Sequence, residues 1–471
     1  MRWRRWGVAL AFLVVLWAVW VLESARWGVD MAEMRVGETP VTYMTDGRDG
    51  PVVVLAHGFA GSRQMMQGYG LLLAQAGYRV YAFDFLGHGQ HPAPMSGDVT
   101  AVDGTTRLLV DQTLQVIEAV RAEGVVALVG HSMATDVLVR AAAQTDGIGP
   151  LVLLATFSGA VTPDFPDDML MITGAWEPRL QGFAADAVAE AAPGVRREAI
   201  VVPAVEHVAI LHSRAGRAAA LDWINESYGR SETALVPQTG WALLGLLAAI
   251  TVLFAPVARA FAARPVQTVP LSRKGFAVAV GLPLVAAPLL AYPIETSVLP
   301  VLVADYLALH LALYGVLQLA VLWYLRGAPA WPSLPGGALV LVWTVGIFGL
   351  ALHRYGANFW PTPERLAIIA ALCLGAVPFM LADNRLVHEA RLARRIIARL
   401  GFLLSLAIAV ALDFEGLFFL ILIAPVIVLF YLSFGWVGRV SAARFGPGGA
   451  GLALGIALAW ALGVSFPLFQ A

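Results

Sequence analysis

A serine with the surroundings of a nucleophile lies in the stretch "LVGHSMATDV" (128–137). A serine hydroxyl attacks a carbonyl group when a base removes its proton and hydrogen-bond donors stabilise the oxyanion that forms. The apolar run "VVALV" precedes "GHSMA", and the helix-like run "MATDVLVRAAAQ" overlaps and follows it. A sharp turn between a strand and a helix exposes a serine above the edge of a sheet. The pattern therefore predicts that Ser132 is a catalytic nucleophile.

Small residues must stand two positions before and two positions after Ser132 so that this turn can close. Gly130 meets the requirement, and Ala134 stands where a second glycine is usual. Ala134 is small enough if its backbone angles stay in the ordinary range. A chance match at the cap of a helix is the alternative interpretation. The position of the motif directly after an apolar strand favours the nucleophile turn.

Four motifs within residues of about 45 to 228 resemble those of the serine α/β-hydrolase family. In chain order they resemble its oxyanion loop, its strand-end glycine-histidine motif, its nucleophile turn and its final histidine segment: "HGFAGS" (57–62), "FDFLGHGQ" (83–90), "GHSMA" (130–134) and "VEHVAILHS" (205–213). The resemblance implies hydrolysis, or occasionally acyl transfer, of an ester, a thioester or an amide. A serine triad of this kind requires no metal ion and no organic cofactor.

The resemblance also implies where the oxyanion would be bound. The backbone N–H groups of Phe59 and Met133 would be the donors. His57, Gly58 and His88 would shape the loops, with the two histidines as structural hydrogen-bonding groups rather than proton carriers. A plain glycine turn is the alternative interpretation of "HGFAGS".

The base is expected after the last strand, because only the carboxyl edge of the sheet can reach the nucleophile. His207 in "AVEHVAIL" has this position. The competing residue is His212, which is expected inside the following helix. Glu206, beside His207, is expected to point away from the site.

The acid that orients the base is expected after the preceding strand. Glu177 follows Gly174, at the end of "DMLMITG", by three residues. Many relatives have aspartate here, but glutamate also serves as a triad acid. The order Ser132, Glu177, His207 is the order that this fold uses. The alternative is that Glu177 is a surface carboxylate and that another acid takes its role: Asp164, Asp167 or Asp168.

Apolar runs and helix-like stretches alternate between about residues 30 and 230. The runs are "PVVVLAHGF" (51–59), "RVYAFDF" (79–85), "VVALVGH" (125–131), "PLVLLATF" (150–157), "DMLMITGA" (168–175) and "EAIVVPAV" (198–205). Short runs that are apolar throughout suit strands buried on both faces of a parallel sheet. Their alternation with helices predicts a doubly wound α/β domain. "MRVGETPVTYMTDGRDG" predicts a hairpin that leads into it.

The chain is more apolar than a soluble domain. Of its residues, 59% are hydrophobic and 13% are charged, whereas about a quarter are charged in soluble domains. "MRWRRWGVALAFLVVLWAVWVLE" predicts a membrane anchor within residues 1–28. A cleaved signal peptide is the alternative, but "VWVLESAR" is a poor cleavage site.

Further apolar segments predict a transmembrane bundle of about eight helices over residues 231–471, after an α/β domain over 29–230. The segments lie near 240–262, 275–292, 299–325, 337–353, 366–383, 398–412, 415–435 and 449–467. "DFEG" (413–416) divides a run that is too long for one helix. The predicted fold is an α/β-hydrolase domain with a mostly parallel sheet, preceded by one transmembrane helix and followed by an all-α transmembrane bundle.

Cations in the loops predict the orientation, because cytoplasmic loops are enriched in lysine and arginine. The loops that would share a side with the N-terminus carry most of them: Arg264, Arg273, Lys274, Arg385, Arg391, Arg394, Arg395, Arg399, Arg439 and Arg444. The pattern predicts a multi-pass protein of the plasma or inner membrane. Its N-terminus would be cytoplasmic and its hydrolase domain would lie on the extracytoplasmic side.

Ionisable residues inside spans are costly and are therefore functional candidates. Asp305 and His310 fall within one predicted span. A structural role is the alternative for this pair, and Asp413 and Glu415 are expected in an interfacial loop without a special role. No inverted repeat or selectivity-filter motif is evident, so transport has no support in the sequence.

The net charge of −1 gives no reason to expect a nucleic-acid partner. The single cysteine, Cys373, excludes an intramolecular disulfide. The segment "SGAVTPDFPD" between two strands is too short for a helical cap over the site. If the membrane surface or the helical bundle covers the site instead, an amphiphilic or lipid substrate is expected. The alternatives to a hydrolase are an acyltransferase and a transporter or assembly component with a non-catalytic hydrolase-like domain; the oligomeric state has no signature in the sequence.

Overall fold

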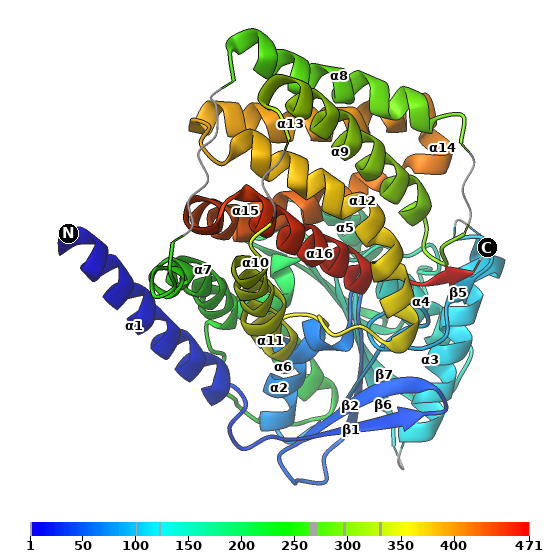
Figure 1. Ribbon diagram of the computed structural model, residues 1–471. Coiled ribbons are helices and arrows are strands. Elements are labelled where there is room, and N and C mark those ends of the chain that lie inside the picture. The colour runs from blue at the N-terminus through cyan, green and yellow to red at the C-terminus, as the bar shows by residue number, and fades with distance from the viewer. Residues whose placement is uncertain are drawn as a thin grey trace. The chain divides into compact units, whose positions relative to one another are not determined.

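The computed structural model describes residues 2–99, 101–121, 124–263, 271–294, 298–328 and 332–470 (Figure 1). Its contacts divide the chain into two compact units. The helical unit comprises Met1–Val15, Leu247–Ala351 and Pro361–Phe466. The sheet unit comprises Leu16–Leu246, Leu352–Trp360 and Pro467–Ala471. Each unit is described by itself below.

The sheet unit is built on eight strands in the order β1-β2-β4-β3-β6-β7-β8-β9. These strands are β1 (Asp30–Val36), β2 (Thr39–Thr45), β3 (Val52–Ala56), β4 (Arg79–Phe83), β6 (Val126–His131), β7 (Ile148–Leu154), β8 (Asp168–Gly174) and β9 (Arg196–Val202). β1 pairs with β2, and β2 with β4, in antiparallel fashion, and all other pairs are parallel. The predicted α/β fold with a mostly parallel sheet and a leading hairpin is confirmed.

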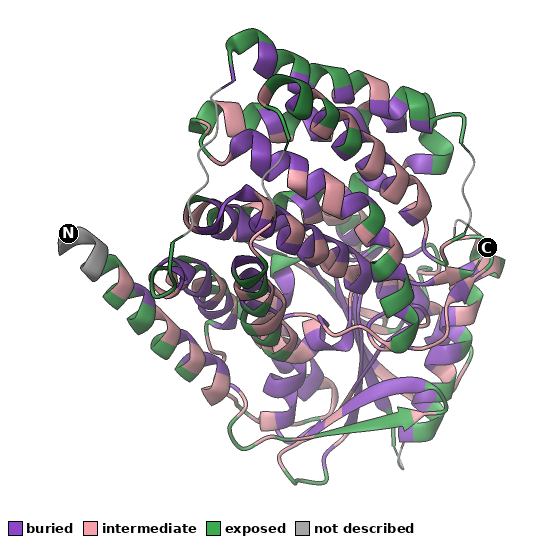
Figure 2. Ribbon diagram, in the orientation of Figure 1, coloured by how far each residue is buried: buried purple, intermediate pink, exposed green. Residues whose placement is uncertain are grey.

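Two hydrophobic cores cover the two faces of this sheet. Alternate residues of β3 show the division, because successive side chains of a strand point to opposite faces. Val52, Val54 and Ala56 belong to the core that includes α3 (Arg107–Val120), α4 (Met133–Ala142) and α5 (Pro178–Ala189). Val53 and Leu55 belong to the core that includes α2 (Gln67–Gln75) and α6 (Arg214–Ser227). Burial on both faces explains why the central strands, such as β3 and β6, consist almost entirely of apolar residues (purple in Figure 2), whereas the edge strands β1 and β9 are partly exposed and carry charges.

The connection between β7 and β8 carries no helix. Residues 155–167 form turns and one isolated bridge, between Thr162 and Phe165. This agrees with the expectation that the segment is too short for a helical cap.

Two segments distant in the sequence complete the sheet unit. Residues 352–360 include the end of α11 (Gly349–Tyr355) and lie before α12 (Pro363–Val387). Near the other end, β10 (Phe469–Gln470) pairs in parallel with β5 (Met95–Ser96), as Figure 1 shows. Hydrogen bonds from Leu468 N–H to the Gly87 carbonyl, 2.8 Å, and from Met95 N–H to the Leu468 carbonyl, 3.0 Å, extend this pairing.

In the described part of the chain, nine helices are long and apolar enough to cross a membrane, as the sequence predicts. Eight of them are single helices: α1 (Arg2–Ser24), α7 (Thr239–Arg259), α8 (Arg273–Ala291), α9 (Ala304–Arg326), α12, α13 (Leu392–Leu412), α15 (Leu420–Phe445) and α16 (Pro447–Ser465). The ninth consists of α10 (Leu334–Leu341) and α11 (Gly349–Tyr355), which a π-helical segment (Val342–Phe348) joins. The short helix α14 (Phe414–Leu417) separates α13 from α15. The predicted division at residues 413–416 is therefore present.

Asp305 and His310 lie in one apolar helix, as the sequence predicts, with Asp305 at its very start. Asp305 lies in the first turn of α9, and its carboxylate accepts the N–H groups of Val298 and Leu299 at 3.1 and 2.9 Å. These hydrogen bonds hold the preceding segment against the start of α9. His310 is fully buried, and its Nε2 lies 3.0 Å from the Ser405 hydroxyl on α13. Both residues therefore have structural partners, and no chemistry follows from them.

Candidate active site

Ser132 lies in the turn between β6 and α4, where its backbone adopts φ 53° and ψ −118°. A residue with a side chain rarely adopts a positive φ, and such a conformation costs about 1–3 kcal/mol. The surrounding structure must therefore enforce it. The strained turn places the hydroxyl beyond the end of the strand, at the N-terminus of a helix. This is the local structure that the motif "GHSMA" predicts.

Steric contacts explain why the residues two positions before and after Ser132 are small, as expected. A Cβ atom on Gly130 would lie 2.6 Å from Leu138 Cδ1 and 3.2 Å from the Ala134 carbonyl oxygen. Ala134 is fully buried and lies inside the regular helix α4. Its backbone therefore needs no glycine, and the departure from the family pattern has no steric consequence.

Ser132, His207 and Glu177 form a continuous chain of hydrogen bonds. Ser132 Oγ lies 2.8 Å from His207 Nε2, and His207 Nδ1 lies 2.5 Å from Glu177 Oε1. In the tautomer that a base requires, Nδ1–H donates to the carboxylate and Nε2 accepts the serine proton. The other oxygen of Glu177 accepts the Gly174 N–H at 2.9 Å. The carboxylate, 8% exposed, is thereby held from both sides.

The loops after the last two long strands position the base and the acid. Glu177 is the N-cap residue of α5, which follows β8. His207 lies between β9 and the 3₁₀ turn Ala209–His212. Glu206 accepts the N–H groups of Val208 and Ala209 and so caps its own turn, away from the site as expected.

His212, the alternative to His207, and Asp168, an alternative to Glu177, have other partners. His212 packs against the backbone position of Gly240, and its carbonyl accepts a hydrogen bond from Arg217. Asp168 forms an ion pair with Arg196 at 3.1 Å. His207, and not His212, contacts the Ser132 hydroxyl, and Glu177, rather than Asp168, contacts His207. Within the described ranges, no group of three or more His, Cys, Asp or Glu side chains has the arrangement of a metal site.

The loop after β3 carries Phe59, one of the two expected oxyanion donors, and passes close to Ser132. A Cβ atom on Gly58 would lie 3.0 Å from Ser132 Cβ and 2.9 Å from His131 Nδ1. Only glycine therefore allows this approach. Met133, the other expected donor, is the first residue of α4, where a backbone N–H has no partner within the helix. Met133 directly follows Ser132, Phe59 directly follows Gly58, and the catalytic role of both residues stays a prediction.

A buried ion pair that the sequence motifs did not single out anchors this loop. Asp84, 0% exposed, follows β4 and pairs with the guanidinium of Arg63. Its two oxygens also accept the backbone N–H groups of Arg63 at 2.7 Å and Gln90 at 2.9 Å. One carboxylate therefore joins the loop after β3 to the loop after β4.

His57 has the structural role that the sequence predicts. Its Nδ1 donates to the Gly58 carbonyl at 2.8 Å, and its Nε2 accepts the Phe85 N–H at 3.1 Å. Burial lowers the pKa of His57 below its ordinary value. The ring therefore remains neutral and keeps one donor and one acceptor.

His131, the residue before Ser132, contacts the loop that carries the base. Its Nε2 lies 2.8 Å from the His207 carbonyl oxygen, to which it donates, and the two rings are 5.0 Å apart. Burial lowers the pKa of His131 to about 3. The imidazole is therefore neutral at pH 7, and its remaining proton holds the backbone of His207. The motif "GHSMA" contains His131 but does not reveal this role, because the contact joins positions that are far apart in the chain.

A segment from the C-terminal half also supports the oxyanion loop. The Asn358 N–H donates to the Ser62 hydroxyl at 3.0 Å, and its side-chain amide donates to the Gly89 carbonyl at 3.2 Å. Ser62 belongs to "HGFAGS" and Gly89 to "FDFLGHGQ". Asn358 thus joins the same two loops as the ion pair of Asp84 does.

Exposed apolar side chains surround the triad. Phe157, Trp176 and Val208 are exposed and lie in the loops after β7, β8 and β9. Trp176 directly precedes Glu177, and Val208 directly follows His207. The Phe157 N–H donates to the Thr135 hydroxyl, three residues after Ser132, at 3.1 Å. The site therefore has an apolar rim.

Residues 51–262 match the family model of the alpha/beta hydrolase fold. This part of the chain is an alpha/beta hydrolase domain. The resemblance seen in the sequence motifs is confirmed, and the family supports a hydrolase activity. No curated protein matches the chain in a sequence comparison.

Solved structures similar to this hydrolase domain include several hydrolases. A predicted CIB-like hydrolase from Thermoplasma acidophilum is 15% identical, with a TM-score of 0.35, over 42% of this chain and 98% of its own. A dienelactone hydrolase from Anabaena variabilis is 16% identical, with a TM-score of 0.33, over 43% of this chain and 96% of its own. An epoxide hydrolase from an endophytic Streptomyces is 15% identical, with a TM-score of 0.34, over 43% of this chain and 97% of its own.

Two histidines of the hydrolase domain with strongly lowered pKa values, His131 and His212, predict an acid-sensitive stability. Burial lowers the pKa of His131 to about 3 and that of His212 to about 4, from 6.5. Below about pH 6.5 the unfolded chain binds protons at these positions that the folded domain does not bind. The stabilisation is therefore complete above this pH and decreases as the pH falls toward 4. Thermal unfolding in detergent, followed by tryptophan fluorescence, is expected to show a lower Tm at pH 5 than at pH 7.

The variant His131→Gln provides the control. Glutamine keeps an N–H donor but does not titrate in this range. Its Tm is expected to change less between pH 7 and pH 5 than the Tm of the wild type. An equal change in both proteins would show that other groups cause the acid sensitivity.

Proposed function

We propose that this protein is a membrane-embedded serine hydrolase that cleaves an ester, a thioester or an amide. Ser132 is the nucleophile, His207 the general base and Glu177 the acid that orients it. The observation that carries the proposal is the chain of hydrogen bonds from Ser132 Oγ to His207 Nε2, 2.8 Å, and from His207 Nδ1 to Glu177, 2.5 Å.

The proposed reaction has two steps that use the same residues. His207 Nε2 takes the proton of Ser132 while Oγ bonds to the carbonyl carbon, and the N–H groups of Phe59 and Met133 bind the oxyanion. His207 then gives this proton to the leaving group, which departs and leaves an acyl group on Ser132. In the second step, His207 takes a proton from a water molecule while its oxygen bonds to the acyl carbon. The bond to Ser132 Oγ then breaks, the acid is released, and His207 returns the proton to Ser132. Glu177 stabilises the imidazolium that forms in each step.

We propose an amphiphilic substrate, such as a lipid, for this site. The connection between β7 and β8 forms no helical cap, and apolar side chains of Phe157, Trp176 and Val208 are exposed around the triad. Exposed apolar groups of this kind favour binding of an apolar chain, since contact with it removes them from water.

Membrane insertion belongs to the same proposal. Apolar helices of sufficient length support it. The cations after α7, α12 and α15 favour a cytoplasmic N-terminus and an extracytoplasmic hydrolase domain. Membrane lipids are then both the surroundings and a source of substrate.

Labelling with a fluorophosphonate in isolated membranes tests the proposal. The probe forms a bond between Ser132 Oγ and phosphorus, loses fluoride, and leaves the serine proton with His207. We expect the wild type to be labelled and Ser132→Ala not to be labelled. Ser158→Ala serves as the matched control, because this buried serine binds Asp136 and is not part of the triad. Labelling of Ser132→Ala, or none of the folded wild type, would refute the proposal.

A further inference from the structure

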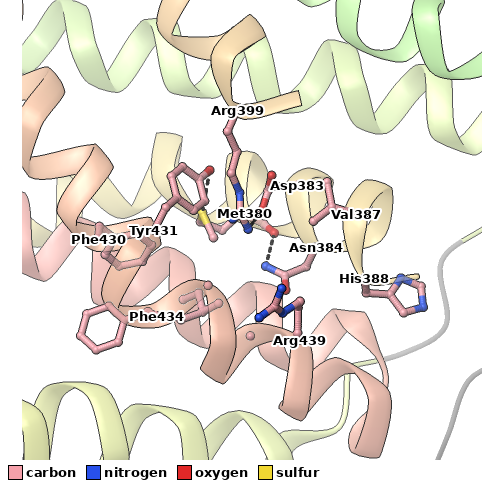
Figure 3. Close-up of a pocket in the computed structure, with 13 residues that line it drawn as sticks. Met380, Asp383, Asn384, Val387, His388, Arg399, Phe430, Tyr431, Phe434 and Arg439 are labelled. Carbon is pink, nitrogen blue, oxygen red and sulfur yellow. Dashed lines mark hydrogen bonds and ion pairs between the residues drawn. The ribbon is translucent and has the colours of Figure 1, made fainter. Parts of the chain in front are cut away.

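Two features of the C-terminal half lie outside the triad, and the first is a polar cavity between α12, α13, α15 and α16 (Figure 3). It has room for about one water molecule. The Arg399 guanidinium there lies 3.5 Å from the Asp383 carboxylate and 4.1 Å from the centre of the Tyr431 ring. These groups are partners of one another, and the cavity is too small for a substrate.

The second feature is the connection between α11 and α12, residues 352–360. These residues belong to the sheet unit, although they lie beyond the family match, which ends at residue 262. Asn358 and Phe359 are buried, and Arg354 donates two hydrogen bonds to the Glu23 carboxylate, at 2.6 and 2.9 Å. The hydrolase domain therefore has a fixed neighbour from outside the part of the chain that the family describes.

The oxyanion loop beside this connection has a defined peptide orientation. The peptide unit between Gly58 and Phe59 carries one of the two proposed oxyanion donors, the Phe59 N–H. Its carbonyl, that of Gly58, accepts His57 Nδ1–H at 2.8 Å and the Gly61 N–H at 3.0 Å. The carbonyl and the N–H of a trans peptide unit point in opposite directions. The direction of the Phe59 N–H therefore depends on the position of residues 57–62.

Asn358 holds the end of this loop through two donors. Its backbone N–H donates to the Ser62 hydroxyl at 3.0 Å, and its Nδ2 donates to the carbonyls of Gly89, 3.2 Å, and Trp360, 3.1 Å. Ser62 is 2% exposed and Asn358 is 6% exposed. Water is therefore excluded from these contacts and does not replace a donor that is lost.

We propose that Asn358 is a positioning residue for the oxyanion hole, through which the connection between α11 and α12 sets the reactivity of Ser132. It acts through Ser62 and Gly89, which hold the loop of Phe59, and not on the substrate itself. The inference rests on the proposed hydrolase activity. It adds that the hydrolase domain depends on the C-terminal half of the chain for its full rate.

The variant Asn358→Asp tests this proposal in the full-length protein, purified in a neutral detergent. Aspartate has nearly the same size, but an acceptor oxygen replaces the donor that faces the carbonyls of Gly89 and Trp360. Fluorophosphonate labelling is measured over a range of probe concentrations. We expect the labelling rate at saturation to fall about tenfold to hundredfold, because a misplacement of about 1 Å at a reacting centre has an effect of this size. The half-saturating concentration is expected to stay unchanged, since the loop orients a donor and does not bind the rest of the probe.

Asn225→Asp is the matched control, because Asn225 is also 6% exposed. Its side chain accepts the Tyr78 hydroxyl and donates to the Glu232 carbonyl, both at 2.7 Å. Tyr78 directly precedes β4, at the edge of the sheet opposite to the triad. Both variants are expected to have a lower Tm than the wild type, but only Asn358→Asp is expected to slow labelling. A purely structural role of Asn358 would give two variants that label alike.

Ser62→Ala is the second test, and it also covers the case in which Asn358→Asp does not fold. It removes the acceptor of the Asn358 N–H by deleting one oxygen atom, and it is expected to slow the same step. Wild-type rates at saturation in the folded variants would overturn the inference and leave the proposed activity intact. A wild type that is not labelled would refute the activity, and the inference with it.

Discussion

Replacing Glu177 with glutamine is expected to lower the catalytic rate about 10⁴-fold, as the loss of a triad carboxylate does. Glutamine has nearly the same size, so Ser132 and His207 keep their places. Its amide, however, cannot stabilise an imidazolium, and its N–H₂ group can turn the ring to the wrong tautomer. The contact of 2.5 Å between His207 Nδ1 and Glu177 Oε1 is where this change acts.

The rate of fluorophosphonate labelling is the suitable measurement, since it reports activation of Ser132 without a known substrate. Glu206→Gln makes the same chemical change at the neighbouring acid, whose carboxylate caps its own turn. It is expected to label at nearly the wild-type rate. If Glu177→Gln also labelled at this rate, Glu177 would be a structural N-cap residue and another group would orient the base.

Replacing Asp84 with asparagine is expected to destabilise the hydrolase domain by about 3–5 kcal/mol, the usual effect of removing one partner of a buried ion pair. Arg63 is 4% exposed and would keep only its pair with Glu33, whose side chain is 65% exposed. Asparagine also has one acceptor oxygen where the carboxylate uses both. The N–H group of Arg63 or Gln90 would therefore face an amide N–H₂.

Thermal unfolding of the purified protein measures this effect. Glu118→Gln is the control, because it also exchanges a carboxylate for an amide. Glu118 forms an ion pair with Arg121, and its side chain is 73% exposed. Exposed pairs contribute about 0–1 kcal/mol, so its Tm is expected to stay close to that of the wild type. Labelling is also expected to slow in Asp84→Asn, since Asp84 anchors the loop that carries Phe59. Equal Tm values for both variants would show that the loop has other sufficient anchors.

The strands and the order of the site residues could be predicted because their signals are local. A strand buried on both faces must be apolar throughout, and the turn at Ser132 must have small residues two positions away on each side. Ser132 and Glu177 follow two such strands, β6 and β8, and His207 follows β9 at the edge of the same sheet. Once the parallel sheet is recognised, the three must meet at one edge.

The supports of the site could not be predicted, because their signals are not local. His131 holds the backbone of His207, and Asn358 holds Ser62, across long intervals of sequence. A single histidine or asparagine has no periodic pattern that reveals its partner. The structural role of Asp305 could not be predicted for a related reason: hydropathy finds an apolar segment, but the residue at which its helix begins depends on capping contacts.

The pairing of β10 with β5 has a consequence for biosynthesis. Translation proceeds from the N-terminus, and domains commonly fold while the ribosome is still adding residues. Ser132, Glu177 and His207 emerge early, but Asn358 emerges after half of the apolar helices of the C-terminal half, and residues 467–470 emerge after all of them. The nascent hydrolase domain therefore lacks these contacts while those helices are synthesised. A ribosome that stops before residue 467 leaves it without its last strand.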